Sequence, residues 1–128
     1  MRLLLDTHIL LWMALDSPRL KTKARLLLND PENILLFSAA SIWEIAIKNR
    51  IARSTFAVDP LVFRQSLLGR RFGELAITSV HAAATESLPM LHNDPFDRLL
   101  IAQAASEGLV LVTSDKAVLQ YPGSIRGV

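Results

Sequence analysis

The 128-residue sequence predicts an α/β fold in which helices cover both faces of a parallel sheet. Short apolar runs of strand length alternate with longer segments whose apolar residues recur at helical spacing. A strand buried on both faces reads as a continuous apolar run, and RLLL at the start of the chain is such a run. The expected architecture is a three-layer α/β/α sandwich with a central parallel sheet.

Four strands are expected at 2–6, 33–38, 74–78 and 109–114. Six helices are expected at 7–15, 18–29, 41–50, 59–72, 79–88 and 94–108, followed by a short segment at 116–119. Asp94 precedes a proline at the start of the sixth helix. Aspartate caps the free N–H groups of a helix, and proline in the first turn has no N–H to leave unpaired. Asp94 is therefore the expected N-cap of that helix.

The length suits one domain spanning residues 1–128, without internal repeats or a linker. Apolar residues make up 51% of the chain and the mean hydropathy is +0.32, which is high for so short a protein. This excess predicts either a self-association face or partner groove, or a compact leucine-rich core. A net charge of +2 permits a nucleic-acid partner without requiring one.

No segment is expected to cross a membrane. The longest apolar stretch, ILLFSAASIWEIAI, is interrupted by serines and by Glu44, and it falls short of the roughly 18 apolar residues that a span needs. The segment MRLLLD is too short before its first acid for a signal peptide. The absence of cysteine excludes disulfides and thiolate metal sites, and makes the reducing cytoplasm the expected location.

Four carboxylates are expected at the carboxyl edge of the sheet, where α/β proteins bind ligands. Asp6 ends the first strand, and Asp115 follows the last one. Glu44 lies about one turn into the helix after the second strand. Asp97 lies in the first turn of its helix above an apolar stripe, so it should face the sheet.

Each of these carboxylates taken alone also has an ordinary structural interpretation. Asp6 could cap the next helix, and Glu44 could pair in solvent with a lysine one turn later. Asp97 could complete a capping box, and Asp115 could be a turn residue. Together, however, they repel one another unless a cation lies among them. A hard divalent cation such as Mg²⁺ or Mn²⁺ prefers oxygen ligands of this kind.

Other catalytic patterns fit the sequence less well. The histidines are His8, His81 and His92. They lack zinc-site spacing, and a packing or surface role is expected for His8, although it follows Asp6 closely enough to line the site. The chain has no Walker loop, G-x-G-x-x-G or G-x-S-x-G motif. Trp12 and Trp43 are expected in the core rather than as platforms on which bases stack. Basic residues available for phosphates, each of which alone suits a solvated face, are Lys21, Lys23, Arg25, Arg50, Arg53, Arg70 and Arg71.

Four segments carry a resemblance to a known family: LLLDTHILLW, SAASIWEIAIK, HNDPFDRLLIAQA and LVLVTSD. With these segments in this order, the chain resembles PIN-domain proteins over essentially its whole length. The likeness is strongest to the VapC-type toxins of type II toxin–antitoxin pairs. The most specific signatures are D-T-H-x-L-L-W and D-P-F-D-R.

The resemblance carries the family's acidic residues onto Asp6, Glu44, Asp97 and Asp115, and its neighbouring hydroxyl residues onto Thr7, Ser41 and Thr113. It implies a PIN-like fold and a metal-dependent endoribonuclease that hydrolyses RNA phosphodiester bonds. It also implies a homodimer and inhibition by a small cognate antitoxin. We assign Asp6 and Asp97 as the main ligands of Mg²⁺ or Mn²⁺. Glu44 and Asp115 are assigned as further ligands or as groups that hold water.

Three other functions remain as alternatives. A haloacid-dehalogenase-like phosphatase needs a second aspartate two residues after the first, where this chain has His8. A receiver-type signalling domain needs paired acids by the first strand and a phosphoacceptor aspartate after a middle strand, and neither is visible. A binding module without chemistry would have no use for four acids at one edge of the sheet.

Overall fold

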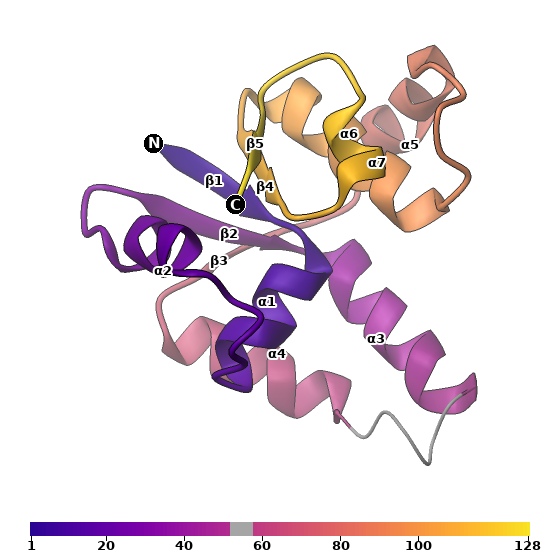
Figure 1. Cartoon of the computed structure of the whole chain (residues 1–128). Coiled ribbons are helices and arrows are strands. Elements are labelled where there is room, and N and C mark those ends of the chain that lie inside the picture. The colour runs from indigo at the N-terminus through magenta and orange to yellow at the C-terminus, as the bar shows by residue number, and fades with distance from the viewer. Residues whose placement is uncertain (52–57) are drawn as a thin grey trace.

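The computed structural model describes residues 1–51 and 58–128 (Figure 1). Within them, a five-stranded sheet has the order β3-β2-β1-β4-β5, and every neighbouring pair is parallel. The strands are β1 (Arg2–Leu5), β2 (Ile34–Ser38), β3 (Gly73–Leu75), β4 (Val110–Thr113) and β5 (Ile125–Gly127). The predicted parallel-sheet α/β class is confirmed.

Helices cover both faces of this sheet, as Figure 1 shows. One face carries α1 (Thr7–Ala14), α2 (Thr22–Asn29), α3 (Ala39–Ile51) and α4 (Pro60–Gly69). The other carries α5 (Ser79–Ala84), the 3₁₀ turn η1 (Thr85–Ser87), α6 (Pro95–Glu107) and α7 (Lys116–Leu119). No helix in the described part of the chain is long and apolar enough to cross a membrane.

Strand β1 lies at the centre of the sheet and is buried on both faces. Leu3 and Leu5 pack in one core with side chains of α1, α3 and α4, while Leu4 packs in a second core with side chains of α6 and α7. All three leucines are fully buried. Successive side chains of a strand point to opposite faces, so a strand between two helical layers needs apolar residues at every position.

Several element boundaries differ from the sequence-based prediction. Helix α4 ends at Gly69 instead of residue 72, β3 ends at Leu75 instead of residue 78, and α5 ends at Ala84, where the 3₁₀ turn η1 follows. The second helix begins at Thr22 instead of residue 18 because a turn precedes it, in which the Arg25 guanidinium donates to the carbonyl oxygens of Ser17 at 2.9 Å and Leu20 at 3.1 Å. The short segment expected at 116–119 forms helix α7, but strand β5 was not expected. Its three residues are too few to show a pattern in sequence, and they are placed by pairing with β4.

The order of the strands defines where a ligand should bind. From β1 the chain adds β2 and β3 on one side, and it later adds β4 and β5 on the other. The carboxyl ends of β1 and β4 therefore flank a topological switch point, which is where open α/β sheets bind ligands. Asp6 directly follows β1, and Asp115 lies two residues after β4.

Candidate active site

Asp6 is held at the end of β1 with one carboxylate oxygen satisfied and the other free. Only 2% of the residue is exposed. The Thr113 hydroxyl donates to Oδ2 of Asp6 at 2.6 Å, across the β1–β4 pair. Oδ1 is buried and has no hydrogen-bond partner among the residues that the structure describes. Asp6 makes no side-chain cap to α1, so the capping interpretation of this residue is wrong.

Glu44 is buried in α3 despite its ion pair with a lysine. The Lys48 ammonium lies 2.9 Å from Oε2, but Glu44 is only 4% exposed, so the pair is not a solvated one. Oε1 is buried and lacks a hydrogen-bond partner within residues 1–51 and 58–128. One turn earlier in α3, Ser41 accepts a 2.8 Å hydrogen bond from Thr7 and joins the starts of α1 and α3.

The two aspartates of HNDPFD have different environments. Asp94 is the N-cap of α6: its Oδ1 accepts from the N–H groups of Phe96 at 2.9 Å and Asp97 at 3.2 Å. Asp97 is buried instead, and its Oδ2 lies 2.8 Å from Nε2 of His92. One ligand-type atom from each of His92, Asp94 and Asp97 lies within 4.8 Å of the others.

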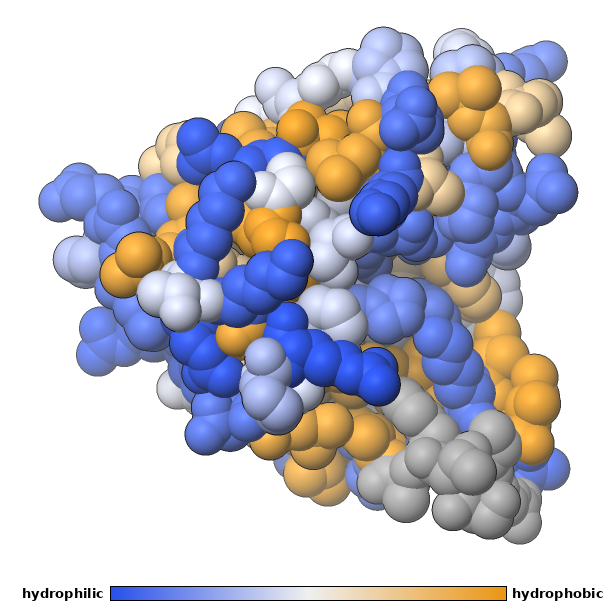
Figure 2. Space-filling view, viewed as in Figure 1, coloured by the Kyte–Doolittle hydropathy of each residue, from blue (hydrophilic) through white to orange (hydrophobic). Residues whose placement is uncertain are grey.

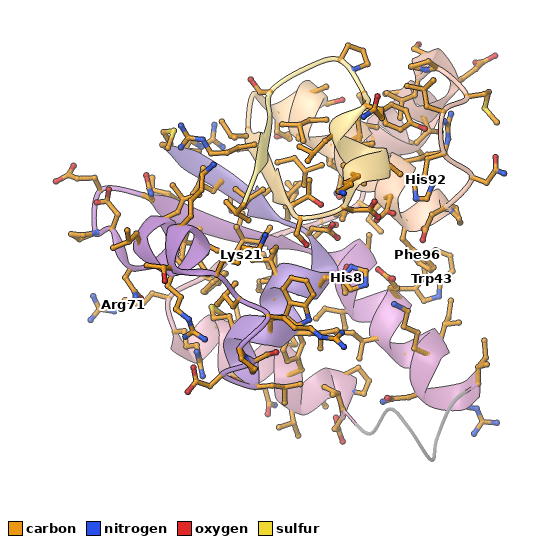
Figure 3. The ribbon with its side chains drawn as sticks, viewed as in Figure 1. His8, Lys21, Trp43, Arg71, His92 and Phe96 are labelled. Atoms are coloured by element: carbon orange, nitrogen blue, oxygen red, sulfur yellow. The ribbon has the colours of Figure 1, made fainter. Side chains whose placement is uncertain are left out.

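The contact between His92 and Asp97 was not predicted from the sequence. The place of His92 in the motif, five residues before Asp97, is the signal that was available, but only the fold of the segment leading into α6 brings the ring onto the carboxylate. Figure 3 shows His92 on that segment and His8 on α1.

Asp115 lies at the rim of this group. It is partly exposed, and its Oδ1 accepts from the Ala117 N–H at 2.8 Å and caps α7. Its own N–H donates to the Thr113 hydroxyl at 3.0 Å, the same hydroxyl that donates to Asp6. Asp115 thus has the expected turn role. It is also linked to Asp6 through the Thr113 hydroxyl, which both residues contact.

The buried carboxylates act on one another electrostatically. Burial raises the pKa of Asp6, and the Glu44 charge raises it further, against the lowering effects of the Thr113 hydrogen bond and of His8. Burial, reinforced by Asp6, raises the pKa of Asp97 to about 7, while the hydrogen bond from His92 opposes the shift. Asp6, Glu44 and Asp97 therefore share one region. Two of its buried oxygens accept no hydrogen bond from the part of the chain that the structure describes, and this set of oxygen ligands fits a hard divalent cation.

The surface around this region combines hydrophilic side chains with exposed apolar ones such as Met90 and Leu91. In Figure 2 the molecule is hollowed between the side of α6 and α7 and the side of α1 and α3, and hydrophilic side chains border the hollow. Of the predicted basic residues, Lys21, Lys23, Arg50, Arg70 and Arg71 are exposed, but Arg71 lies far from His92 in Figure 3. Arg25 has a structural role, because it also pairs with Asp16 at 2.9 Å. The predicted basic residue Arg53 lies outside the described residues.

The two tryptophans differ from the expected core placement. Trp12 is partly buried against the core of α1 and α4. Trp43 is 57% exposed, so its predicted core position is wrong. It packs edge-on against Phe96, with ring centroids 5.1 Å apart, as the neighbouring rings in Figure 3 show.

Comparison with known proteins places this chain in a family. The PIN domain model matches residues 3–123. Ribonuclease VapC22 of Mycobacterium tuberculosis is 30% identical over 119 residues, which cover 92% of this chain and 90% of that protein. The chain therefore belongs to the PIN domain family, and the resemblance seen in its sequence motifs is confirmed.

Solved structures show the same fold at lower identity. VapBC2 from Rickettsia felis, bound to a DNA fragment from its promoter, matches with a TM-score of 0.73 and 17% identity over 100% of this chain and 99% of that one. DNA-bound VapBC from Salmonella typhimurium matches with a TM-score of 0.65 and 19% identity over 100% and 97% of the two chains.

Replacement of Asp94 by alanine should lower the free energy of unfolding by about 1 kcal/mol, because two N–H groups of α6 lose their acceptor. Urea unfolding would measure the change. Asp59 is a matched control, since it caps α4 through the N–H groups of Leu61 and Val62 in the same way. A loss several times that of Asp59→Ala would contradict a role limited to capping.

The metal-free protein should lose stability as pH rises from about 4 to about 7. Burial raises the pKa of Asp97 from 3.8 to about 7, so the native state holds this proton more tightly than the unfolded chain does. The favourable contribution is complete below about pH 4 and is lost as pH rises past about 7. In thermal melts with chelator, the Tm of wild type should fall more steeply over this range than that of Asp97→Asn. If the Tm of the two proteins changes in parallel with pH, the pKa of Asp97 is not raised.

Proposed function

We propose that residues 1–128 form a single PIN-like nuclease domain that acts as a metal-dependent endoribonuclease. Its substrate is RNA, and its role is that of the toxin in a toxin–antitoxin pair. The observation that carries the proposal is the pair of buried oxygens on Asp6 and Glu44 beside Asp97, which have no hydrogen-bond partner among the described residues. The ribonuclease name of the Mycobacterium tuberculosis relative supports it, as do the VapBC complexes that share the fold.

Asp6 and Asp97 would be the main ligands of Mg²⁺ or Mn²⁺, with Glu44 and Asp115 as further ligands or as groups that hold water. When bound, the ion neutralises charge on the phosphoryl oxygens and lowers the pKa of water. Thr113 fixes the orientation of Asp6 through its 2.6 Å hydrogen bond. His92 does the same for Asp97 through the 2.8 Å contact between Nε2 and Oδ2.

Glu44 is the carboxylate best arranged to orient the attacking water. Lys48 engages Oε2 at 2.9 Å, which leaves Oε1 free to accept a hydrogen bond and then a proton from that water. Because Lys48 is partly exposed while Glu44 is buried, the ammonium group supplies charge from the rim without filling the centre of the site.

The chain would act as a homodimer in the cytoplasm and bind a cognate antitoxin. Leu61 and Val62 on α4 are each 60% exposed, which supports an apolar face buried against a second copy. Met90 and Leu91 are 75% and 54% exposed and immediately precede His92. An antitoxin that covers this pair would lie beside the candidate site.

Added Mg²⁺ or Mn²⁺ should raise the Tm and switch on RNA cleavage, because a ligand that binds only the native state stabilises it by mass action. Asp97→Asn should abolish cleavage and reduce the metal-induced gain in Tm, while Asp59→Ala should retain both. The measurement pairs thermal melts with a cleavage assay, with chelator and with metal. If chelator and metal change neither Tm nor cleavage in wild type, the metal proposal is wrong.

Expression of the chain alone in bacteria should arrest growth, and Asp97→Asn should relieve the arrest. Co-expression with its cognate antitoxin should restore growth and yield a complex. Light scattering of that complex should show two copies of the 14.2 kDa chain. Harmless expression of a chain that cleaves RNA in vitro would contradict the toxin role, and a single copy per complex would contradict the dimer.

A further inference from the structure

A cavity lies next to the candidate metal site, at the switch point of the sheet. It has a volume of about 300 Å³ and is lined by His8, Trp12, Arg19, Ser114 and Asp115. Its walls come from the segments that follow β1 and β4. Asp115 is common to both places, and His8 is near enough to Asp6 to lower the pKa of that carboxyl. A ligand in this cavity would thus lie beside the carboxylates proposed to cut RNA.

An aromatic pair forms one side of the cavity. His8 and Trp12 are four residues apart on α1, so they share a helix face, and their ring centroids are 6.1 Å apart at an interplanar angle of 51°. His8 is exposed. Trp12 packs partly against the core, which fixes its ring while leaving part of it accessible. A fixed, accessible indole is a surface on which a planar group can stack.

The charged groups of the cavity favour a neutral planar ligand with a phosphate beside it. Asp115 places a carboxylate in the wall, and this charge disfavours a phosphate in the cavity itself. Arg19 is exposed, and no hydrogen bond or ion pair from the rest of the described chain engages its guanidinium. It is therefore free to bind an anion at the edge. Nucleic acid offers this combination of an uncharged base and a charged backbone.

We propose that this cavity binds one unpaired nucleobase of the RNA strand, stacked on Trp12, while Arg19 contacts the adjoining phosphate. The inference rests on the proposed ribonuclease function and adds a substrate requirement to it. A base inside an RNA helix is stacked on its neighbours, whereas a base in a loop can turn out onto a protein side chain. The cavity therefore selects unpaired segments and sets the distance from the bound base to the bond that is cut.

Fluorescence of Trp12 gives a direct test. Trp43→Phe leaves Trp12 as the single tryptophan, since the chain has two. In chelator, which prevents cleavage by the proposed mechanism, a uridine hexanucleotide should quench its emission with saturation. A hexamer of the same charge that lacks bases should not. Unchanged Trp12 emission at concentrations where the hexanucleotide binds would overturn the proposal.

Affinity measurements separate stacking from charge. Trp12→Leu should weaken binding of the base-bearing hexamer about tenfold or more and leave binding of the abasic hexamer unchanged. Trp12→Phe should keep most of the affinity because it keeps a ring, and Trp43→Leu is the matched control at the other tryptophan. Arg19→Gln should weaken both hexamers equally and reduce the salt dependence of binding. Equal losses for the two hexamers in Trp12→Leu would overturn the stacking assignment.

The two measurements test the base site separately from the proposed ribonuclease function. Metal-dependent cleavage by wild type, together with an unperturbed Trp12 signal, would retain the ribonuclease and reject the base site. Saturable quenching by the hexanucleotide without any cleavage in Mg²⁺ or Mn²⁺ would retain the base site and reject the nuclease. If Trp12→Leu fails to fold, the fluorescence titration on Trp43→Phe decides the question alone.

Discussion

Three buried carboxylates at one edge of a parallel sheet are the constraint to which the rest of this structure responds. Asp6, Glu44 and Asp97 are each at most 6% exposed, and Lys48 is the cation paired with them within the described residues. Isolated buried charge is costly, and like charges in one place add to that cost. The raised pKa values of Asp6 and Asp97 are the direct expression of this conflict. Such an arrangement needs a rigid frame, and in our proposal a bound divalent cation supplies the counter-charge.

The frame is a set of buried hydrogen bonds that join segments distant in sequence. Thr113 links β4 to Asp6, and Thr7 on α1 links to Ser41 on α3. Ser38 at the end of β2 donates to Gln103 of α6 at 2.5 Å, and Gln103 is fully buried. Each bond joins two of the segments that carry the acids. Because every partner is buried, breaking one of these bonds would leave an unsatisfied polar group in the core. This cost holds the site geometry in place.

The sequence predicted those parts of the site that local chemistry determines. Asp94 before a proline indicates a cap from the residue types alone, and an acid directly after an apolar run indicates the edge of a parallel sheet. What could not be predicted depends on contacts between segments far apart in the fold. The approach of His92 to Asp97 depends on the path of the segment before α6, and the exposure of Trp43 depends on which side of α3 meets its neighbours. In α3 the structure buries Glu44 and exposes Trp43, so residue type alone does not indicate which side of this helix faces the core.

The same excess of negative charge has a consequence for substrate binding. Nucleic acid carries one negative charge per nucleotide, so the carboxylates that would perform hydrolysis also repel the strand they act on. Affinity must come from groups outside the acidic centre. The switch point of the sheet supplies such a place, because the residues after β1 provide both Asp6, on the strand end, and the aromatic face of α1 one turn further on. In our proposals, chemistry and recognition thus arise from one short segment, DTHILLW: its first residue is a metal ligand, and its last is the ring on which a base stacks.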